Sequence, residues 1–256
     1  MKAERAQEKQ REKKIYMPDK TDLHTHTIAS GHAYSTRNEM IAAAAAKELE
    51  IYAVTEHAPA MPGSCHSMYF MNFRALPRKH ENMTVLYGAE LNILDYEGHV
   101  DLPESILKEL DLTLASIHVP CFSAGSKEEN TKAYVEAMKN PYINIIAHPD
   151  DARFPINYKE LVKAAKEYHV ILEVNNASLA PGSFRGDPRA AYCEMLDLCI
   201  QYQVPVTMDS DAHVDSAVGV HDYAEKVLQK VEFPEKLLVN SHPELLKDYI
   251  NYYQKE

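Results

Sequence analysis

Histidines stand at the ends of apolar, strand-like runs along most of this chain of 256 residues. Six such runs end in, or carry, a histidine or a carboxylate: Thr21–Thr27, Ile51–His57, Thr84–Leu94, Leu110–His118, Ile143–His148 and Val204–His213. The carboxyl ends of parallel strands meet at one edge of a sheet, so parallel pairing would gather these side chains at one mouth. The pattern therefore predicts an active site that holds several metal ions.

A seventh apolar run, Val170–Asn176, and the helical segments between the runs indicate an α/β fold. Near-continuous apolar strands that alternate with helices are typical of a parallel sheet covered on both faces. We expect the sheet to close into a barrel, because only closure brings so many strand ends round one centre. An open doubly wound sheet is the alternative.

The clearest helix is expected over Thr36–Glu50, where Thr36 and Glu39 can form a capping box ahead of an alanine-rich body. Further helices are predicted over Glu104–Glu109, Glu128–Lys139, Tyr158–His169, Pro188–Gln203, Tyr223–Lys230 and Pro243–Tyr253. No repeat or long linker divides the sequence. We therefore expect a charged extension over residues 1–15 and a single domain over residues 16–256.

Composition narrows the class of protein. The net charge of −11, from 27 basic and 38 acidic residues, disfavours a broad nucleic-acid surface. The sequence has no run of eighteen apolar residues, which argues against a membrane span. Residues 1–15 lack the apolar segment of a secretory signal. The four cysteines show no C-x-x-C spacing, so we expect reduced thiols and a cytoplasmic location.

The His24-Thr25-His26 motif suits chelation, because residues i and i+2 of a strand point to the same face. An H-x-H motif is weak evidence alone, but seven histidines and two carboxylates at strand ends have no packing reason to gather. Imidazoles and carboxylates without thiolates suit Zn²⁺, Mn²⁺ or Fe²⁺, and Zn²⁺ fits the nitrogen-rich set best. Nine ligands are enough for three ions. Glu90 is the natural bridge, since a carboxylate offers two oxygens.

Taken in order, the motifs DLHTHT, GHAYST, VTEHAP, GAELNI, SIHVP, AHPDD, EVNNAS and SDAH resemble the PHP (polymerase and histidinol phosphatase) superfamily. The pattern is closest to its YcdX-type phosphatase branch, and the resemblance runs from Tyr16 to the C-terminus. It implies a distorted (β/α)7 barrel, TIM-like, with a trinuclear metal cluster that hydrolyses phosphoesters. Family members also suggest assembly into a homo-oligomer.

The resemblance distributes nine metal ligands over three ions. It implies a first ion on His24, His26, Glu90 and Asp211, a second on Glu90, His118 and His148, and a third on His32, His57 and His213. Glu56 stands before His57 where many relatives have aspartate. It is expected either to orient a ligand or to be a solvated or salt-bridged side chain.

The expected reaction is the hydrolysis of a phosphate monoester of a small metabolite. A hydroxide that bridges the first two ions would attack phosphorus in line, and the third ion would hold a phosphate oxygen. The catalytic residues are expected to be Glu90, Asp211 and His118, with Asp211 serving as a ligand or as a proton carrier. The predicted substrate contacts are Arg74, Arg78, Arg153, Arg185, His66 and Asn175.

Three other functions remain open. An amidohydrolase-type barrel also begins with H-x-H, but it needs a bridging lysine on its fourth strand, where this chain has His118. A PHP nuclease would act on nucleic acid, for which the sequence shows no basic groove. A non-enzymatic metal-binding module would be expected to have lost some of the nine ligands.

Overall fold

The structure, a computed structural model, describes residues 18–254. Seven parallel strands pair in the order in which they occur in the chain: β1 (Thr21–Asp22), β2 (Ile51–His57), β4 (Met83–Asn92), β5 (Leu112–Ser116), β6 (Ile145–Ile146), β7 (Ile171–Asn175) and β8 (Val206–Asp209). Each lies within a predicted run, except that β4 begins one residue earlier than its run, at Met83. The short strand β3 (Lys79–His80) was not predicted, and it pairs antiparallel with β4. The expected seven-stranded α/β barrel is confirmed.

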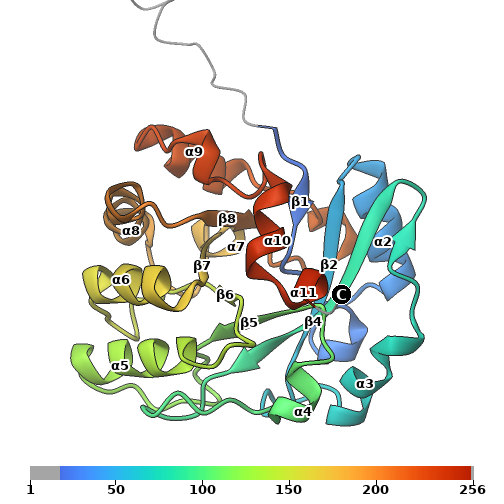
Figure 1. The fold of residues 1–256 in the computed structure, drawn as a ribbon, viewed down its shortest axis with the longest axis horizontal. Coiled ribbons are helices and arrows are strands. Elements are labelled where there is room, and N and C mark those ends of the chain that lie inside the picture. Colours follow the sequence, from blue (N-terminus) through green and yellow to red (C-terminus); the bar gives the residue numbers. More distant parts are fainter. Residues whose placement is uncertain (1–17, 255–256) are drawn as a thin grey trace, which may run out of the picture.

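The ring of strands is nearly closed at a seam between β1 and β8 (Figure 1). The backbone N–H of Leu23 donates to the Asp209 carboxylate over 2.7 Å. Just beyond, Thr25 and Ala212 form a single parallel bridge, and the N–H of His26 donates to the Ala212 carbonyl over 2.8 Å. The seam therefore depends on few contacts, and these lie beside the predicted ligands at both of its edges.

Helices surround the ring, and most were predicted within a few residues. They are α2 (Arg37–Ala46), α3 (Ser67–Met71), α4 (Glu104–Leu107), α5 (Lys127–Met138), α6 (Tyr158–Tyr168), α7 (Asn176–Leu179), α8 (Arg189–Tyr202), α9 (Asp222–Lys230), α10 (Leu246–Tyr249) and α11 (Asn251–Gln254). In the described part of the chain, five 3-10 turns accompany them: η1 (Ile28–Ser30), η2 (Asn72–Ala75), η3 (Asp215–Ala217), η4 (Glu235–Leu237) and η5 (Pro243–Leu245).

The capping box of α2 forms as predicted, with Glu39 N–H on the Thr36 hydroxyl and Thr36 N–H on the Glu39 carboxylate. The single terminal helix expected over residues 243–253 is wrong. That segment is divided into η5, α10 and α11, and the extended backbone of Ile250 (φ −109°, ψ 150°) separates α10 from α11. The short helices α3 and α7 were not predicted.

The interior of the barrel changes character along the strands. At the amino-terminal end, inward positions are apolar, and the buried cluster there includes Ile51, Leu86, Leu112 and Ile171. Leu246 and Ile250 of the C-terminal segment pack into the same cluster and close that end. Side chains at every second position of a strand point to the same face. The inward positions further along the same strands, such as His57 and Glu90, are polar. The barrel is thus a packed core at one end and a polar site at the other.

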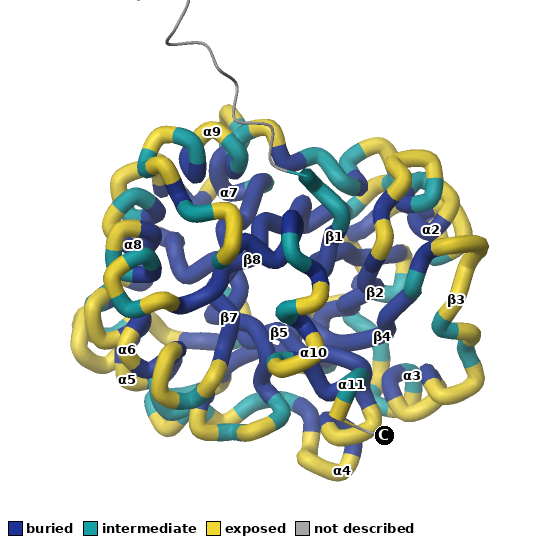
Figure 2. The backbone as a smooth tube through the Cα atoms, turned by 45° about the horizontal axis from the view of Figure 1, so that its top comes forward, coloured by how far each residue is buried: buried dark blue, intermediate teal, exposed yellow. Residues whose placement is uncertain are grey.

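A second, larger buried cluster lies between the strands and the outer helices. Figure 2 shows this arrangement, with buried strands inside a layer of helices whose outer sides are exposed. Among residues 18–254, no helix is both long enough and apolar enough to cross a membrane. The expected charged extension, residues 1–15, lies outside the described residues.

Candidate metal centre

Five imidazoles surround the carboxylate of Glu90, which is fully buried in β4. The five come from the ends of four other strands, and their nitrogens lie 2.7–3.4 Å from the Glu90 oxygens. These histidines are His24, His26, His57, His118 and His148. The structure thus brings together side chains that are far apart in the sequence, as the strand-end pattern predicted.

Asp211 supplies a second buried carboxylate on the other side of His24 and His26. Its Oδ1 lies 3.6 Å from His24 Nε2 and 3.3 Å from His26 Nε2, while Glu90 Oε2 lies 3.3 Å and 3.4 Å from the same two nitrogens. A tetrahedral Zn²⁺ at about 2.0–2.1 Å from each donor spaces its donors roughly 3.3 Å apart. These four imidazole–carboxylate distances are close to that spacing, and the donor atoms of His24, His26 and Glu90 all lie within 4.8 Å of one another.

Several of these donor atoms are buried and lack a hydrogen bond. They are His24 Nε2, His26 Nε2, His57 Nδ1, His148 Nδ1 and Glu90 Oε2. Buried polar atoms are rarely left unpaired, because each unpaired atom costs about 1–3 kcal/mol. Because the nitrogens of His24, His26 and His57 in this set contact Glu90 Oε2 without forming a hydrogen bond, the donor set fits metal coordination.

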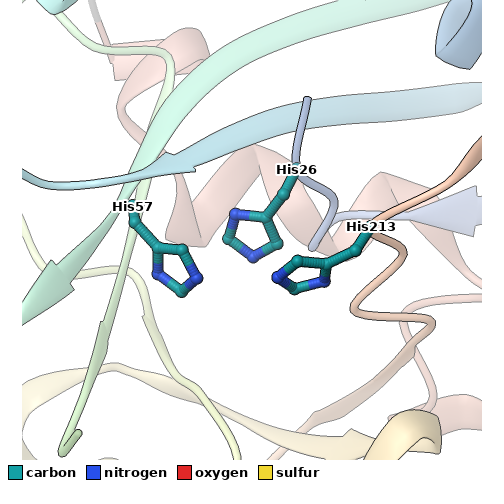
Figure 3. A group of neighbouring side chains, drawn as sticks. All are labelled: His26, His57 and His213. Carbon is teal, nitrogen blue, oxygen red and sulfur yellow. The ribbon is translucent and has the colours of Figure 1, made fainter. Parts of the chain in front are cut away.

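The outer part of the centre is a group of stacked imidazoles (Figure 3). The ring of His26 lies 4.1 Å from that of His57 and 4.4 Å from that of His213. His32 stands 4.8 Å from His57 and 4.9 Å from His213. Figure 3 shows His26, His57 and His213 side by side, with ring nitrogens facing a common space. All nine predicted ligands therefore lie in one connected cluster.

Outer partners fix which nitrogen of each imidazole faces the centre. His24 Nδ1 donates to Glu173 Oε1 over 2.7 Å, and His118 Nδ1 donates to Asn92 Oδ1 over 2.8 Å. Asn92 is itself held by Asp101, which accepts from its amide over 2.7 Å. A donating Nδ1 leaves Nε2 with a free lone pair toward the centre, and this is the arrangement that metal-ligating histidines adopt.

Glu56 acts through Ser30. The Ser30 hydroxyl donates to Glu56 over 2.6 Å and accepts from His57 N–H over 3.0 Å, and His26 Nδ1 lies 3.2 Å from it. Thr27 also donates to Glu56, by its N–H over 3.0 Å and by its hydroxyl. Of the two expectations for Glu56, the structure favours the one in which it orients ligands.

The charges of the cluster favour a cation. Burial lowers the pKa of His26 well below its usual value, and the nearby His57 and His213 lower it further. Burial also lowers the pKa of His118, to about 4. Both imidazoles are therefore neutral at pH 7 and free to coordinate. Burial lowers the pKa of His24 too, but Glu173, Glu90 and Asp211 outweigh it and raise that pKa well above its usual value.

Two of the clustered residues have left-handed backbone. His148 has φ of 30° and Asp211 has φ of 54°. Such backbone costs a non-glycine residue about 1–3 kcal/mol and is found most often at functional sites. At both positions it turns the residue at the end of a strand into the mouth of the barrel.

A cavity of about 650 Å³ opens beside the centre, and its lining includes His32, His57, His118, Asp211 and His213. Two predicted substrate contacts, Arg153 and Arg185, also line it. Buried Arg185 donates to Ser178 Oγ over 2.8 Å and lies 3.4 Å from Asp211. Arg153 forms an ion pair with Asp151 at 2.5 Å.

The other predicted substrate contacts lie elsewhere. Arg74 is exposed in η2, and exposed His66 caps α3 by accepting from Met68 N–H over 3.2 Å, so neither lines the cavity. Arg78 pairs with Asp111 at 2.9 Å, near the amino end of β5. Asn175 is buried behind the centre, where its amide donates to Glu173 and Asp211, each over 3.2 Å. Its position suits a role in orienting carboxylates.

Glu173 and Asn92 were missed as outer partners. Glu173 accepts from both His24 and the backbone N–H of His148, each over 2.7 Å. A charged residue in the middle of the apolar run Val170–Asn176 was the signal that could have identified it. Asn92 follows Glu90 by two residues, so it lies on the same face of β4.

Comparisons with known proteins agree with this geometry. Residues 22–180 match the family model described as "PHP domain". A "Probable phosphatase" of Clostridium novyi is 41% identical over 229 residues, which is 90% of this chain and 93% of that protein. A "Probable phosphatase" of Caldicellulosiruptor bescii is 41% identical over 235 residues, covering 92% and 97%. The crystal structure of histidinol phosphate phosphatase from Lactococcus lactis, complexed with zinc, L-histidinol and phosphate, shares the fold with a TM-score of 0.58 at 16% identity, over 84% of this chain and 95% of that one.

Proposed function

The chain belongs to the PHP domain family and is a metal-dependent phosphatase, and from this premise we propose that it hydrolyses phosphate monoesters of small metabolites with three divalent ions. The observation that carries the proposal is the crowding of five imidazoles round the Glu90 carboxylate, with Asp211 beside them. Nitrogen-rich donors without thiolates favour Zn²⁺, and Mn²⁺ or Fe²⁺ also suits them.

We assign the ligands as three sets. His24, His26, Glu90 and Asp211 would hold one ion, Glu90 with His118 and His148 a second, and His32, His57 and His213 a third. The contacts between His57 and Glu90, and between His26 and His213, link these sets into one cluster. When bound, the ions would lower the pKa of water to about 7, supply hydroxide as the nucleophile and neutralise phosphate charge.

The residues of the chain then have distinct tasks. Glu90 holds two sets of imidazoles together through its two oxygens. Asp211 accepts from Asn175 and stands 3.4 Å from Arg185, which lines the cavity and can donate to a phosphate oxygen. His118, half-buried at the cavity wall, lies between Glu90 and the substrate space.

Charge selects the substrate. Three divalent ions would bring six positive charges against the two carboxylates, a local excess of four inside a chain of net charge −11. A phosphate monoester dianion matches that excess better than a neutral amide does. We propose that the protein acts in the cytoplasm and assembles into a homo-oligomer, which the sequence and the family resemblance support.

The test is a substrate panel with and without chelator. Phosphate monoesters should be hydrolysed and a chelator should abolish their turnover, whereas carboxamides and single-stranded DNA should not react. Replacement of Asp211 by asparagine or His118 by alanine should lower phosphatase kcat at least a hundredfold and reduce the metal content. If turnover survived in both variants with the metal content unchanged, the proposal would be wrong.

A further inference from the structure

The cavity beside the centre is larger than a phosphate group needs. Its volume of about 650 Å³ falls within the range of roughly 300–1,000 Å³ of pockets that hold small organic ligands. The four histidines and Asp211 are five of its eighteen lining residues. The remaining wall therefore faces the group to which the phosphate is esterified.

That remaining wall is mostly apolar. It is lined by Met61, Ile117, Val119, Pro120, Ala177 and Pro181, among others. Against these apolar side chains, a leaving group with many hydroxyls would lose hydrogen bonds to water, at a cost of roughly 1–3 kcal/mol for each group left unpaired. An apolar or aromatic leaving group would instead gain from burial.

Phe184 extends over this wall from the segment between α7 and α8. It lines the cavity and is 75% exposed, which is unusual for a phenylalanine. Two arginines contact its ring, one distant in the sequence and one adjacent. The guanidinium carbon of Arg153 lies 5.2 Å from the ring centre, and that of Arg185 lies 5.3 Å from it. Cation–π contacts at such distances orient an aromatic ring.

The backbone around Phe184 is also built for this position. Gly182 (φ +85°) and Gly186 (φ +95°) flank the residue with left-handed backbone, which turns the segment over the cavity. The carbonyl of Arg185 accepts from Ala152 N–H over 3.3 Å, which ties the segment to the loop after β6. The ring is therefore placed by several contacts while one part of its surface stays open.

Taking the phosphatase function proposed above as given, we propose that this enzyme selects phosphate monoesters whose leaving group carries a planar ring, and that Phe184 recognises that ring by stacking. The phosphate binds at the centre and the ring lies against Phe184 and the apolar wall. Both an aryl group and a nucleobase have this chemistry. Sugar phosphates without a ring of this kind are poor substrates.

Matched substrate pairs test the preference without changing the chemistry of the leaving oxygen. One pair is 2-phenylethyl phosphate and propyl phosphate, and the other is adenosine 5′-monophosphate and ribose 5-phosphate. We expect kcat/KM to be at least tenfold higher for the ring-bearing member of at least one pair. The pair that shows the preference distinguishes an aryl group from a nucleobase.

Variants of Phe184 test the residue. Phe184→Ala should lower kcat/KM about tenfold for the preferred ring ester, equivalent to about 1.4 kcal/mol, and leave its ring-free partner within about twofold. Phe184→Leu, which keeps apolar volume without a π face, should give an intermediate loss. The matched control is Tyr34→Ala, since Tyr34 is 81% exposed and does not line the cavity.

A binding measurement gives a result that does not depend on turnover. The sequence contains no tryptophan, so Phe184→Trp introduces a single tryptophan, whose emission can be excited selectively over that of the tyrosines. Its emission should change on titration with phenylphosphonate and not with methylphosphonate. Turnover of all four esters without a ring preference, or equal losses in Phe184→Ala for both members of each pair, would overturn the inference and leave the phosphatase function standing. Absence of turnover on every ester would instead refute the phosphatase function.

Discussion

His57 and Glu90 are direct partners in the register of β2 and β4, and their side chains meet at the mouth of the barrel. Nδ1 of His57 lies 2.7 Å from Oε2 of Glu90, yet neither atom has a hydrogen bond. The pairing of the two backbones thus fixes the distance between two donor atoms. The Glu90 carboxylate of β4 is central in the cluster. Besides His57 after β2, it contacts the histidines that follow β1, β5 and β6.

Replacement of Glu90 by glutamine should dismantle more than one ion site. The amide keeps the shape of the side chain but loses the charge that faces five imidazoles. We expect at least one divalent ion per chain to be lost and phosphatase kcat to fall at least a hundredfold, measured by elemental analysis and turnover of a phosphate ester. Glu97→Gln, an exposed glutamate, is the matched control. Full metal content in Glu90→Gln would contradict the role of this residue as a bridge.

Replacement of Glu173 by glutamine should weaken metal binding without removing a ligand. Glu173 holds His24 Nδ1 and the backbone of His148, and loss of such an outer partner costs roughly 10–100-fold in metal affinity. Titration against a competing chelator would measure this change. Glu167→Gln, on the exposed side of α6, makes the same change of charge and should bind metal normally. Equal affinities for the two variants would exclude a positioning role for Glu173.

Replacement of Gly31 by alanine should disturb the His32 side of the cluster alone. Gly31 has φ of +81°, and a Cβ there would stand 2.1 Å from the Gly63 carbonyl oxygen. Since His32 is the next residue, we expect a shifted loop, loss of about one ion per chain and a loss of roughly 1–3 kcal/mol in the free energy of unfolding.

Gly219→Ala is the control for Gly31→Ala, because Gly219 also has positive φ (+64°) but its nearest neighbouring atom is 3.5 Å away. This control isolates the backbone strain from the steric clash. Urea unfolding and elemental analysis of both variants separate the two effects. A normal ion count in Gly31→Ala would mean that this loop does not position a ligand.

Replacement of His221 by asparagine should reduce stability in a pH-dependent way. Burial lowers the pKa of His221, but Asp19 at 2.7 Å and Asp22 at 3.7 Å outweigh it and raise that pKa well above its usual value. A histidine whose pKa is raised in the folded state stabilises the folded protein in full below about pH 6.5, the pKa of histidine in the unfolded chain. This stabilisation is lost as the pH rises through the pKa of the folded state.

We therefore expect the free energy of unfolding of His221→Asn to be about 3–5 kcal/mol below that of the unaltered protein at pH 6, and the gap to shrink toward pH 9. Urea unfolding at the two pH values measures it. A gap that widened with pH would show that His221 is neutral in the folded protein. His99→Asn, at an exposed histidine that pairs with Asp95, serves as the control.

The site was predictable from the sequence because every second side chain of a strand points to the same face. Inward residues that are apolar early in a strand, such as Leu86 and Leu112, are followed on the same face by Glu90 and His118. Parallel pairing in sequence order then brings strand ends together without any knowledge of the loops. The seven strands and the gathering of the nine donor residues followed from this regularity.

The substrate contacts were harder to predict, because loops lack such a period. Arg74, Arg78 and Arg185 all follow apolar runs in the sequence, yet Arg185 is buried at the cavity and Arg78 pairs with Asp111 near the other end of the barrel. Outer partners such as Asn92 were missed for a related reason: whether an amide inside a barrel orients a ligand depends on its rotamer and its neighbours. The broken terminal helix reflects packing of Leu246 and Ile250 into the barrel core, which outweighs the helical pattern of the segment.

The barrel should open more easily at the seam between β1 and β8 than between strands that are joined by long ladders. Within residues 18–254, its one ladder contact beyond the short strands is the bridge between Thr25 and Ala212, and the donors His24, His26 and Asp211 lie immediately beside it in the sequence. A cation shared by those three residues would cross-link the first strand of the domain to the last. Cation binding should then slow local opening and amide hydrogen exchange at this seam far more than at the long β2–β4 ladder. The ions that serve the reaction would thus also hold the barrel closed.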